Sequence, residues 1–106
     1  MSKYLLQASY TAEGAKGLLK DGGSKRRAAA KTLVESLGGT IDCFYFAFGK
    51  ADVVAILDFP DSVSAAAASL AISASGAVAG RVTVLLTPEE IDQATKKSAK
   101  YTPPGK

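Results

Sequence analysis

The sequence predicts an α+β fold in which four antiparallel strands form one sheet, with two helices on one face and a short C-terminal helix. Strand-like and helix-like segments follow one another in the order β-α-β-β-α-β. The 106 residues suffice for one domain with its own core but not for two. Apolar residues make up 47% and charged residues 22%, which is typical of a globular protein. We therefore treat residues 1–106 as a single domain, with a core over about 3–90 and a helix and tail over 88–106.

A strand and a helix in two parts are predicted first. Tyr4–Tyr10 alternates with the period of two expected for a strand. Thr11 is placed to cap a helix that ends near Leu19. Ser24 is placed to cap a second helix that stops at Gly38-Gly39. The buried face of that second helix follows the spacing i, i+3, i+4, i+7: Ala30, Leu33, Val34 and Leu37.

A hairpin and an alanine-rich helix are predicted next. Thr40–Phe48 and Asp52–Phe59 are strand-like, and the turn Gly49-Lys50-Ala51 joins them, with Gly49 expected at positive φ. Pro60-Asp61-Ser62 ends the second strand and caps a helix that stops at Gly76 or Gly80. The buried side of this helix is expected to be narrow: Val63, Ala67, Leu70 and Ala74.

The chain closes with a strand, a short helix and a tail. Arg81–Leu86 is predicted as the fourth strand. Thr87-Pro88-Glu89-Glu90 has the spacing of a capping box and begins a helix that runs towards Lys97. Residues 101–106 have the composition of a tail. This element order is that of the ferredoxin-like split βαβ unit.

The predicted hairpin is apolar on both faces. Strict alternation places Ile41, Cys43, Tyr45 and Ala47 on one face of its first strand, and Asp42, Phe44, Phe46 and Phe48 on the other. In the second strand, Val54 and Ile56 oppose Val53, Ala55 and Leu57. Two helices cover only one face, so we expect the same face of another copy to cover the second one in a homodimer or higher homo-oligomer. The alternative is that the segment after Leu86 folds back over its own sheet.

Composition excludes several function classes. With no histidine there is no Ser-His-Asp triad and no imidazole metal site, and with one cysteine there is no internal disulfide. We therefore expect no metal and no cofactor. A net charge of +3 without a basic, aromatic stripe argues against nucleic acid, and Val63–Val82 is too interrupted to span a membrane. We expect a cytoplasmic protein, with Cys43 a packing residue and no apolar signal block in the first residues.

The sequence resembles the GYD-domain family over roughly Tyr4–Glu90. Five pieces carry the resemblance: Tyr10-Thr11-Ala12-Glu13-Gly14-Ala15-Lys16, Ser24-Lys25-Arg26-Arg27, Leu37-Gly38-Gly39, Phe44-Tyr45 leading to Gly49 and Asp52-Val53-Val54-Ala55-Ile56, and Leu86-Thr87-Pro88-Glu89-Glu90. At the motif that names the family, Gly49-Lys50-Ala51-Asp52 keeps glycine and aspartate and has Ala51 where the family has tyrosine. The resemblance implies a ferredoxin-like subunit of the dimeric α/β-barrel type, whose sheet pairs with a partner's sheet. It implies no particular reaction.

Asp52 is the first candidate for chemistry, because it is a carboxylate beside a turn and at the foot of an apolar strand. It either serves as a general base or accepts backbone N–H bonds and fixes the hairpin, and the second role is the commoner one. If the protein is an enzyme, the candidate catalytic residues are Asp52 and Tyr45, with Tyr10 and Lys50 as further polar partners of Asp52. We expect a ligand pocket between sheet and helices that is lined by Tyr10, Tyr45, Gly49, Lys50 and Asp52.

A second candidate is the cluster Ser24, Lys25, Arg26 and Arg27, which places three cations in the first turn of a helix. The helix dipole disfavours cations there, so a bound anion would relieve the arrangement. The simpler interpretation is a solvated cluster, or pairing with Asp21 or Glu35 of the same or another subunit.

These observations favour a small cytoplasmic homo-oligomeric protein that binds a small molecule or serves as a regulatory module. The alternative is a cofactor-independent oxygenase or isomerase that acts on a small apolar substrate with Asp52 as base. The superfamily that the resemblance implies includes such enzymes. A third class is a purely structural assembly subunit without an enclosed pocket.

Overall fold

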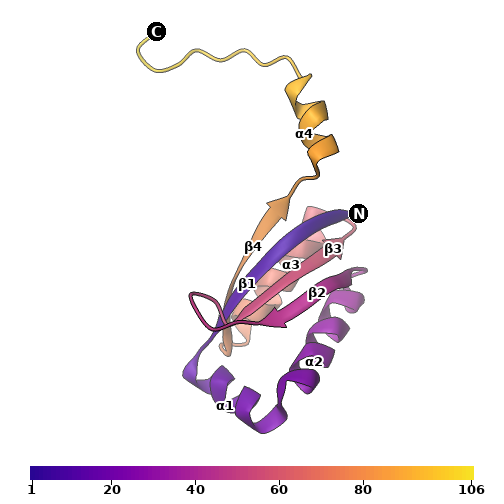
Figure 1. Ribbon diagram of the computed structural model, residues 1–106, viewed down its shortest axis with the longest axis vertical. Coiled ribbons are helices and arrows are strands. Elements are labelled where there is room, and N and C mark those ends of the chain that lie inside the picture. The colour runs from indigo at the N-terminus through magenta and orange to yellow at the C-terminus, as the bar shows by residue number, and fades with distance from the viewer.

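The computed structural model describes all 106 residues, and it contains one four-stranded antiparallel sheet with helices packed on one face (Figure 1). The elements in chain order are β1 (Ser2–Tyr10), α1 (Ala12–Asp21), α2 (Gly23–Ser36), β2 (Thr40–Phe46), β3 (Val53–Phe59), α3 (Ser62–Ala74), β4 (Val78–Leu85) and α4 (Pro88–Thr95). The strands lie in the order β2-β3-β1-β4. The predicted α+β, ferredoxin-like fold is confirmed.

The core lies between the sheet and the helices. Its side chains come mainly from one face of the central strands β1 and β3, joined by helical residues: Tyr4, Leu6, Ala8, Val53, Ala55, Leu57, Phe59, Val34, Ala65 and Ala68. The rings of Tyr4 and Phe59 meet edge to face, with their centroids 5.9 Å apart. The hydroxyl groups of Tyr4 and Ser62 share a hydrogen bond of 3.2 Å, which ties the start of α3 to the sheet.

The opposite face of the sheet carries no helix, and we call it the open face. Figure 1 looks onto it, with α3 behind the strands. Side chains of paired residues in antiparallel strands lie on the same face, so the register arranges the open face in rows. Three rows run from β4 to β2: Leu85, Lys3, Asp58 and Thr40; Thr83, Leu5, Ile56 and Cys43; Arg81, Gln7, Val54 and Tyr45.

A β-bulge interrupts β2 beside Asp42. Ile41 pairs with Leu57 and Cys43 pairs with Ile56, so Asp42 has no partner on β3. Ile41 therefore lies on the helix side and packs against the core. The prediction that Ile41 shares a face with Cys43 is wrong, because an alternating pattern contains no sign of an extra, unpaired residue.

The connection between β2 and β3 is longer than the predicted turn. The strands end at Phe46 and begin again at Val53, and the amide of Ala47 donates to the carbonyl oxygen of Asp52 at 2.8 Å. Gly49 does not adopt positive φ, so that prediction is wrong. A loop over 47–52 is long enough to reverse the chain without the left-handed residues that a two-residue turn requires.

The two-part first helix is confirmed, with a correction at its break. Thr11 caps α1 by accepting a hydrogen bond from the amide of Gly14 at 3.2 Å. α2 begins at Gly23, and no side chain caps it, so Ser24 is not its cap. Gly22 makes the turn instead, at φ 81°, a value that glycine adopts without strain. At the other end of α2, Gly38 has φ 78° and provides the predicted stop.

α3 is capped as predicted but buries a different side. Val63 and Leu70 are 79% and 71% exposed, whereas Ala65 and Ala68 are buried. The prediction for this face is wrong because the helix is apolar nearly all round, so periodicity alone does not select a side. Contact with the sheet selects it, and the small alanine side chains allow the helix to approach closely.

Asp61 caps α3, and its charge should make this helix end sensitive to acid. Its Oδ1 accepts a hydrogen bond of 2.7 Å from the amide of Ser64, and that bond holds the pKa of Asp61 below its ordinary value of 3.8. A lowered pKa means that the stabilisation is present above the unfolded-state pKa of 3.8 and is lost as pH falls through the folded-state value. We expect Asp61→Ala to melt a few degrees lower than wild type at pH 7, with the gap closing towards pH 2. Thermal melts by circular dichroism across this range test it, and a gap independent of pH would contradict it.

The C-terminal segment leaves the domain. β4 begins at Val78, earlier than predicted, and α4 begins with the predicted capping box between Thr87 and Glu90. Residues 86–106 are all exposed, and Figure 1 shows α4 and the tail projecting away from the sheet. The segment after Leu86 therefore does not cover its own open face. No helix of the chain combines the length and the apolar character needed to cross a membrane.

Candidate functional site

Two of the five predicted pocket residues come together where β1 ends. The amide of Asp52 donates to the carbonyl oxygen of Ala8 at 2.8 Å, and Oδ2 of Asp52 accepts from the amide of Tyr10 at 2.8 Å. These bonds attach the β2–β3 loop to the central strand. Asp52 thus has the structural role that its position after a turn favours. Its other oxygen, Oδ1, makes no hydrogen bond within the chain.

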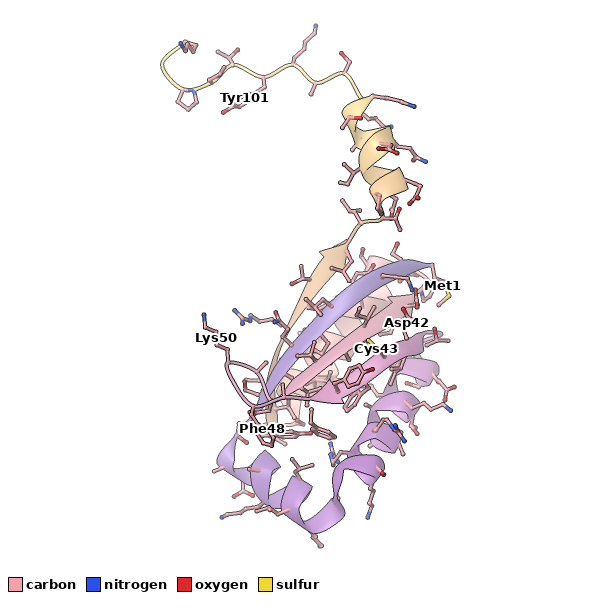
Figure 2. All side chains as sticks on the ribbon, viewed as in Figure 1. Met1, Asp42, Cys43, Phe48, Lys50 and Tyr101 are labelled. Carbon is pink, nitrogen blue, oxygen red and sulfur yellow. The ribbon has the colours of Figure 1, made fainter.

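The other three predicted residues lie elsewhere. Tyr45 is on the open face, 68% exposed, because it pairs with Val54. Gly49 is surrounded by open space. Lys50 contributes only its carbonyl oxygen, which accepts from the Ser9 hydroxyl at 3.2 Å, and its side chain points into solvent (Figure 2).

A cavity of about 490 Å³ lies beside Tyr10 and Asp52, on the helix side of the sheet. It is mostly apolar and draws its lining from α1, the start of α2, β2 and the β2–β3 loop: Tyr10, Ala15, Leu18, Gly23, Phe46, Ala47, Phe48 and Asp52. Phe48 is fully exposed at its rim, on the side of α1 (Figure 2). The cavity therefore offers aromatic walls with a carboxylate and a phenol at one end. This arrangement suits a small apolar molecule that carries one polar group.

The position of α1 shapes this cavity. The amide of Thr11 donates to the carbonyl oxygen of Ala77 at 3.0 Å, and the Thr11 hydroxyl donates to Gly76 and Ala77. α1 comes so close to this segment that a methyl group on Gly14 would overlap the carbonyl of Ala77. Gly14 therefore permits the approach that places Ala15 and Leu18 over the end of the sheet.

Sequence reasoning missed the aromatic and helical walls of the cavity. Phe46 and Phe48 alternate on the side of the strand opposite Tyr45, and Ala15 and Leu18 follow helical spacing. Both patterns are present in the sequence, but neither shows that the two segments meet in the fold.

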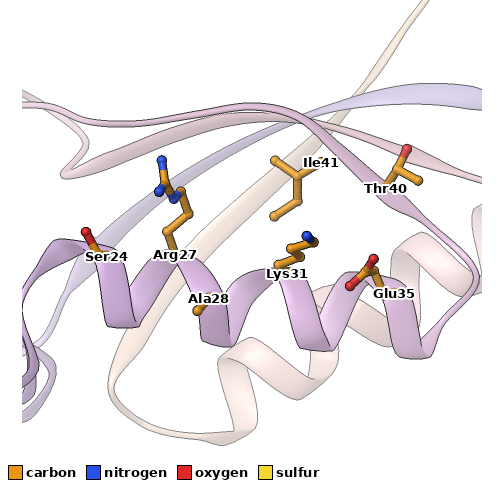
Figure 3. A pocket seen from close by; sticks show the side chains of 7 residues that line it. All are labelled: Ser24, Arg27, Ala28, Lys31, Glu35, Thr40 and Ile41. Atoms are coloured by element: carbon orange, nitrogen blue, oxygen red, sulfur yellow. The ribbon is translucent and has the colours of Figure 1, made fainter.

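The four residues of the basic cluster at the start of α2 fall into two pairs with different surroundings. Lys25 and Arg26 lie 3.5 and 3.8 Å from the carboxylate of Asp21, in agreement with the pairing alternative. Ser24 and Arg27 instead face an open groove of about 500 Å³ between α2 and β2 (Figure 3). Its other lining residues include Lys31, Glu35 and Thr40. Because Glu35 offsets one of the two cations and every charged side chain is exposed, an anion site here remains a prediction.

A charged cluster at one corner of the open face was not predicted. We call it the acidic triad: Lys3, Asp42 and Asp58. The ammonium group of Lys3 lies 3.0 Å from Asp42 and 3.1 Å from Asp58. These hydrogen bonds, first to Asp42 and then to Asp58, raise the pKa of Lys3 above 10.5, so the pairing persists up to strongly alkaline pH. The bulge places Asp42 on this face, and alternation therefore gave no sign of the triad.

The remaining sulfur and carboxylate groups form no further site. Cys43 is a half-buried free thiol on the open face, labelled with Asp42 in Figure 2. No group of three or more cysteine, aspartate or glutamate side chains is placed to hold a metal ion.

Comparison with known proteins gives one finding. A family model described as the GYD domain matches residues 4–95, which is most of the chain. Comparisons with curated proteins and with solved structures found no match.

Proposed function

The chain belongs to the GYD-domain family, and we propose that it is a small-molecule-binding module that functions as a homo-oligomer. The ligand is a small, largely apolar molecule held in the cavity beside Tyr10 and Asp52. Copies associate through the open face of the sheet. A reducing compartment such as the cytoplasm suits the free thiol of Cys43.

The cavity is the observation that carries this proposal. A volume of about 490 Å³ is in the range of ordinary ligand pockets, and aromatic side chains on two sides provide area for contact with a ring. Oδ1 of Asp52 and the hydroxyl of Tyr10 have no hydrogen-bond partner within the chain and are available to orient a polar group. No other cavity of the chain joins a mainly apolar wall to so few polar groups.

The enzymatic alternative depends on Asp52 as a base. Asp52 lines the cavity, which favours contact with a bound molecule, but its Oδ2 is engaged by the amide of Tyr10. A carboxylate that holds the backbone in place is better suited to position a ligand than to remove a proton from it. Under the enzymatic alternative, Asp52→Asn abolishes turnover of a substrate and leaves the melting temperature unchanged. Loss of folding in this variant would instead show that Asp52 acts through the backbone.

Binding of a neutral fluorescent probe, N-phenyl-1-naphthylamine, tests the proposal. We expect saturable enhancement of its fluorescence by the wild-type protein. Phe48→Ala removes one wall, and Ala15→Trp fills the cavity from its rim. We expect each change to weaken binding about tenfold, which corresponds to the loss of one aromatic contact or of the space itself.

Tyr101→Ala is the matched control, because it also removes an exposed aromatic side chain, but from the tail. It should leave probe affinity unchanged. Equal affinity in wild type, Phe48→Ala and Ala15→Trp would contradict binding in this cavity, since the probe would then bind elsewhere.

A further inference from the structure

β2 is an edge strand whose outer side pairs with no other strand of the chain. In the order β2-β3-β1-β4 its one neighbour is β3, so alternate residues of β2 direct their backbone N–H and C=O groups away from the sheet. Edge strands are commonly protected by lysine, by proline or by a bulge. β2 contains neither lysine nor proline, and its bulge at Asp42 affects only its first half. From Cys43 to Phe46 the edge is regular and is available to pair with a further strand.

A groove runs along this edge, between β2 and α2. It consists of two hollows, of about 500 Å³ and about 250 Å³, which share the lining residues Ser24 and Arg27 and therefore adjoin. The first hollow borders the start of β2 at Ile41, and the second borders its end at Phe46. The groove thus follows the strand along its length. The other edge strand, β4, has a cavity only at its last residue, Leu85.

The α2 side of this groove carries cations without partners. Arg27 and Lys31 lie one helical turn apart and project from α2 on the side of β2 (Figure 3). Neither forms an ion pair within the chain, and Glu35, at one end of the groove, offsets only one of them. At the opposite end, Phe44 and Phe46 provide an apolar wall. The groove therefore combines unpaired backbone groups with a basic middle and an apolar end.

We infer that the edge of β2 binds an extended acidic segment of another protein, which adds a strand to the sheet and directs its carboxylates to Arg27 and Lys31. Main-chain hydrogen bonds to β2 provide affinity in such an arrangement, and side chains at alternate positions of the added strand provide specificity. The inference depends neither on the ligand cavity nor on the homo-oligomer of the proposed function.

The spacing of the two cations matches that of an extended chain. Side chains four residues apart on a helix are about 6 Å apart along its axis, and side chains two residues apart on a strand are about 6.8 Å apart. Acidic residues at positions i and i+2 of the added strand can therefore meet Arg27 and Lys31 together. In an antiparallel strand, the residue at position i−2 lies beside Phe44 and Phe46. The expected segment thus has one apolar residue, followed at intervals of two by two acidic residues.

Two occupants from this chain itself are less complementary. Antiparallel pairing of the β2 edges of two copies would bring their Arg27 side chains together, because Arg27 borders both hollows and so lies beside the middle of β2. The tail is extended, but residues 96–106 contain four lysines and no acidic residue. Like charges would meet in both cases, which is unfavourable. An acidic segment of another protein places opposite charges together instead.

Fluorescence anisotropy with the peptide fluorescein-Thr-Leu-Thr-Glu-Val-Glu-Thr-amide tests the inference, because its leucine and two glutamates alternate on one face. We expect saturable binding by wild type, and about tenfold weaker binding by Arg27→Glu and by Lys31→Glu. A matched peptide with lysine in place of both glutamates should bind these two variants more tightly than it binds wild type. Lys97→Glu is the control variant, because it makes the same charge change in the exposed tail and should leave both affinities unchanged.

N-methylation of the peptide separates strand addition from attraction between charges. Two versions carry one methyl group each, on the amide of the third or of the fourth residue, and keep both glutamates. Neighbouring amides of a strand face opposite edges, so one methyl group lies against β2 and the other lies in solvent. We expect about tenfold weaker binding of one version and unchanged binding of the other.

Equal affinity of the two methylated peptides would overturn the inference, because binding would then not involve pairing with β2. An effect of Lys97→Glu as large as that of Arg27→Glu, or no binding by wild type, would also overturn it. Lys31 does not line the cavity beside Tyr10 and Asp52. Binding of N-phenyl-1-naphthylamine should therefore be unchanged in Lys31→Glu, so failure of the proposed function is measured separately.

Discussion

Replacement of Phe59 by alanine should lower the free energy of unfolding by about 4 kcal/mol, which is a large fraction of the stability of a domain of this size. Phe59 is 1% exposed and is the largest fully buried side chain. Its ring packs edge to face on Tyr4 and lies against Gly39, where a Cβ would come within 2.7 Å of it. Phe59 is the last residue of β3 and pairs with Ser2 of β1, so the sheet restrains the backbone around the space that alanine would leave.

Urea unfolding followed by circular dichroism measures this loss, at one fixed protein concentration because association would stabilise the folded state. Phe48→Ala is the matched control. It removes the same side chain from a fully exposed position and should leave the unfolding midpoint unchanged. Equal effects of the two substitutions would mean that Phe59 is not at the centre of the core.

Local rules predicted the strands and most helix ends because each of these depends on neighbouring residues. Alternation in Tyr4–Tyr10 and in Val53–Phe59 matches the burial of the two central strands. The caps at Thr11, Asp61 and Thr87 use side chains within three residues of the amides they bind. Each of these contacts depends only on a short stretch of sequence and can be predicted from it. The structure confirms all three.

Features that depend on contacts between distant segments could not be predicted in the same way. The bulge at Asp42 depends on how β2 pairs with β3, and the buried side of α3 depends on where the sheet lies. The site shows the same division. Asp52 can be predicted because a carboxylate after a turn commonly accepts bonds from backbone amides. The apolar walls contributed by α1 and Phe48 come together only when α1 docks beside Ala77.

That docking leads to the second large effect, at Gly14. We expect Gly14→Ala to lower the free energy of unfolding by about 2–3 kcal/mol, because its methyl group would overlap a backbone carbonyl that cannot rotate away. The new side chain must push α1 from Ala77 and strain the hydrogen bond between Thr11 and Ala77. Since α1 carries Ala15 and Leu18, the same displacement should also weaken probe binding in the cavity.

Gly17→Ala separates this steric effect from the higher helix propensity of alanine relative to glycine. Gly17 lies in the same helix with no atom near its Cβ position, so alanine there should raise the free energy of unfolding by about 0.5–1 kcal/mol. The same chemical change, one helical turn apart, is thus expected to have opposite signs. If both substitutions stabilise the protein in urea unfolding, α1 does not press against Ala77. The distance between α1 and the sheet would then be larger than in the structure. The cavity would be less closed at the end that α1 forms.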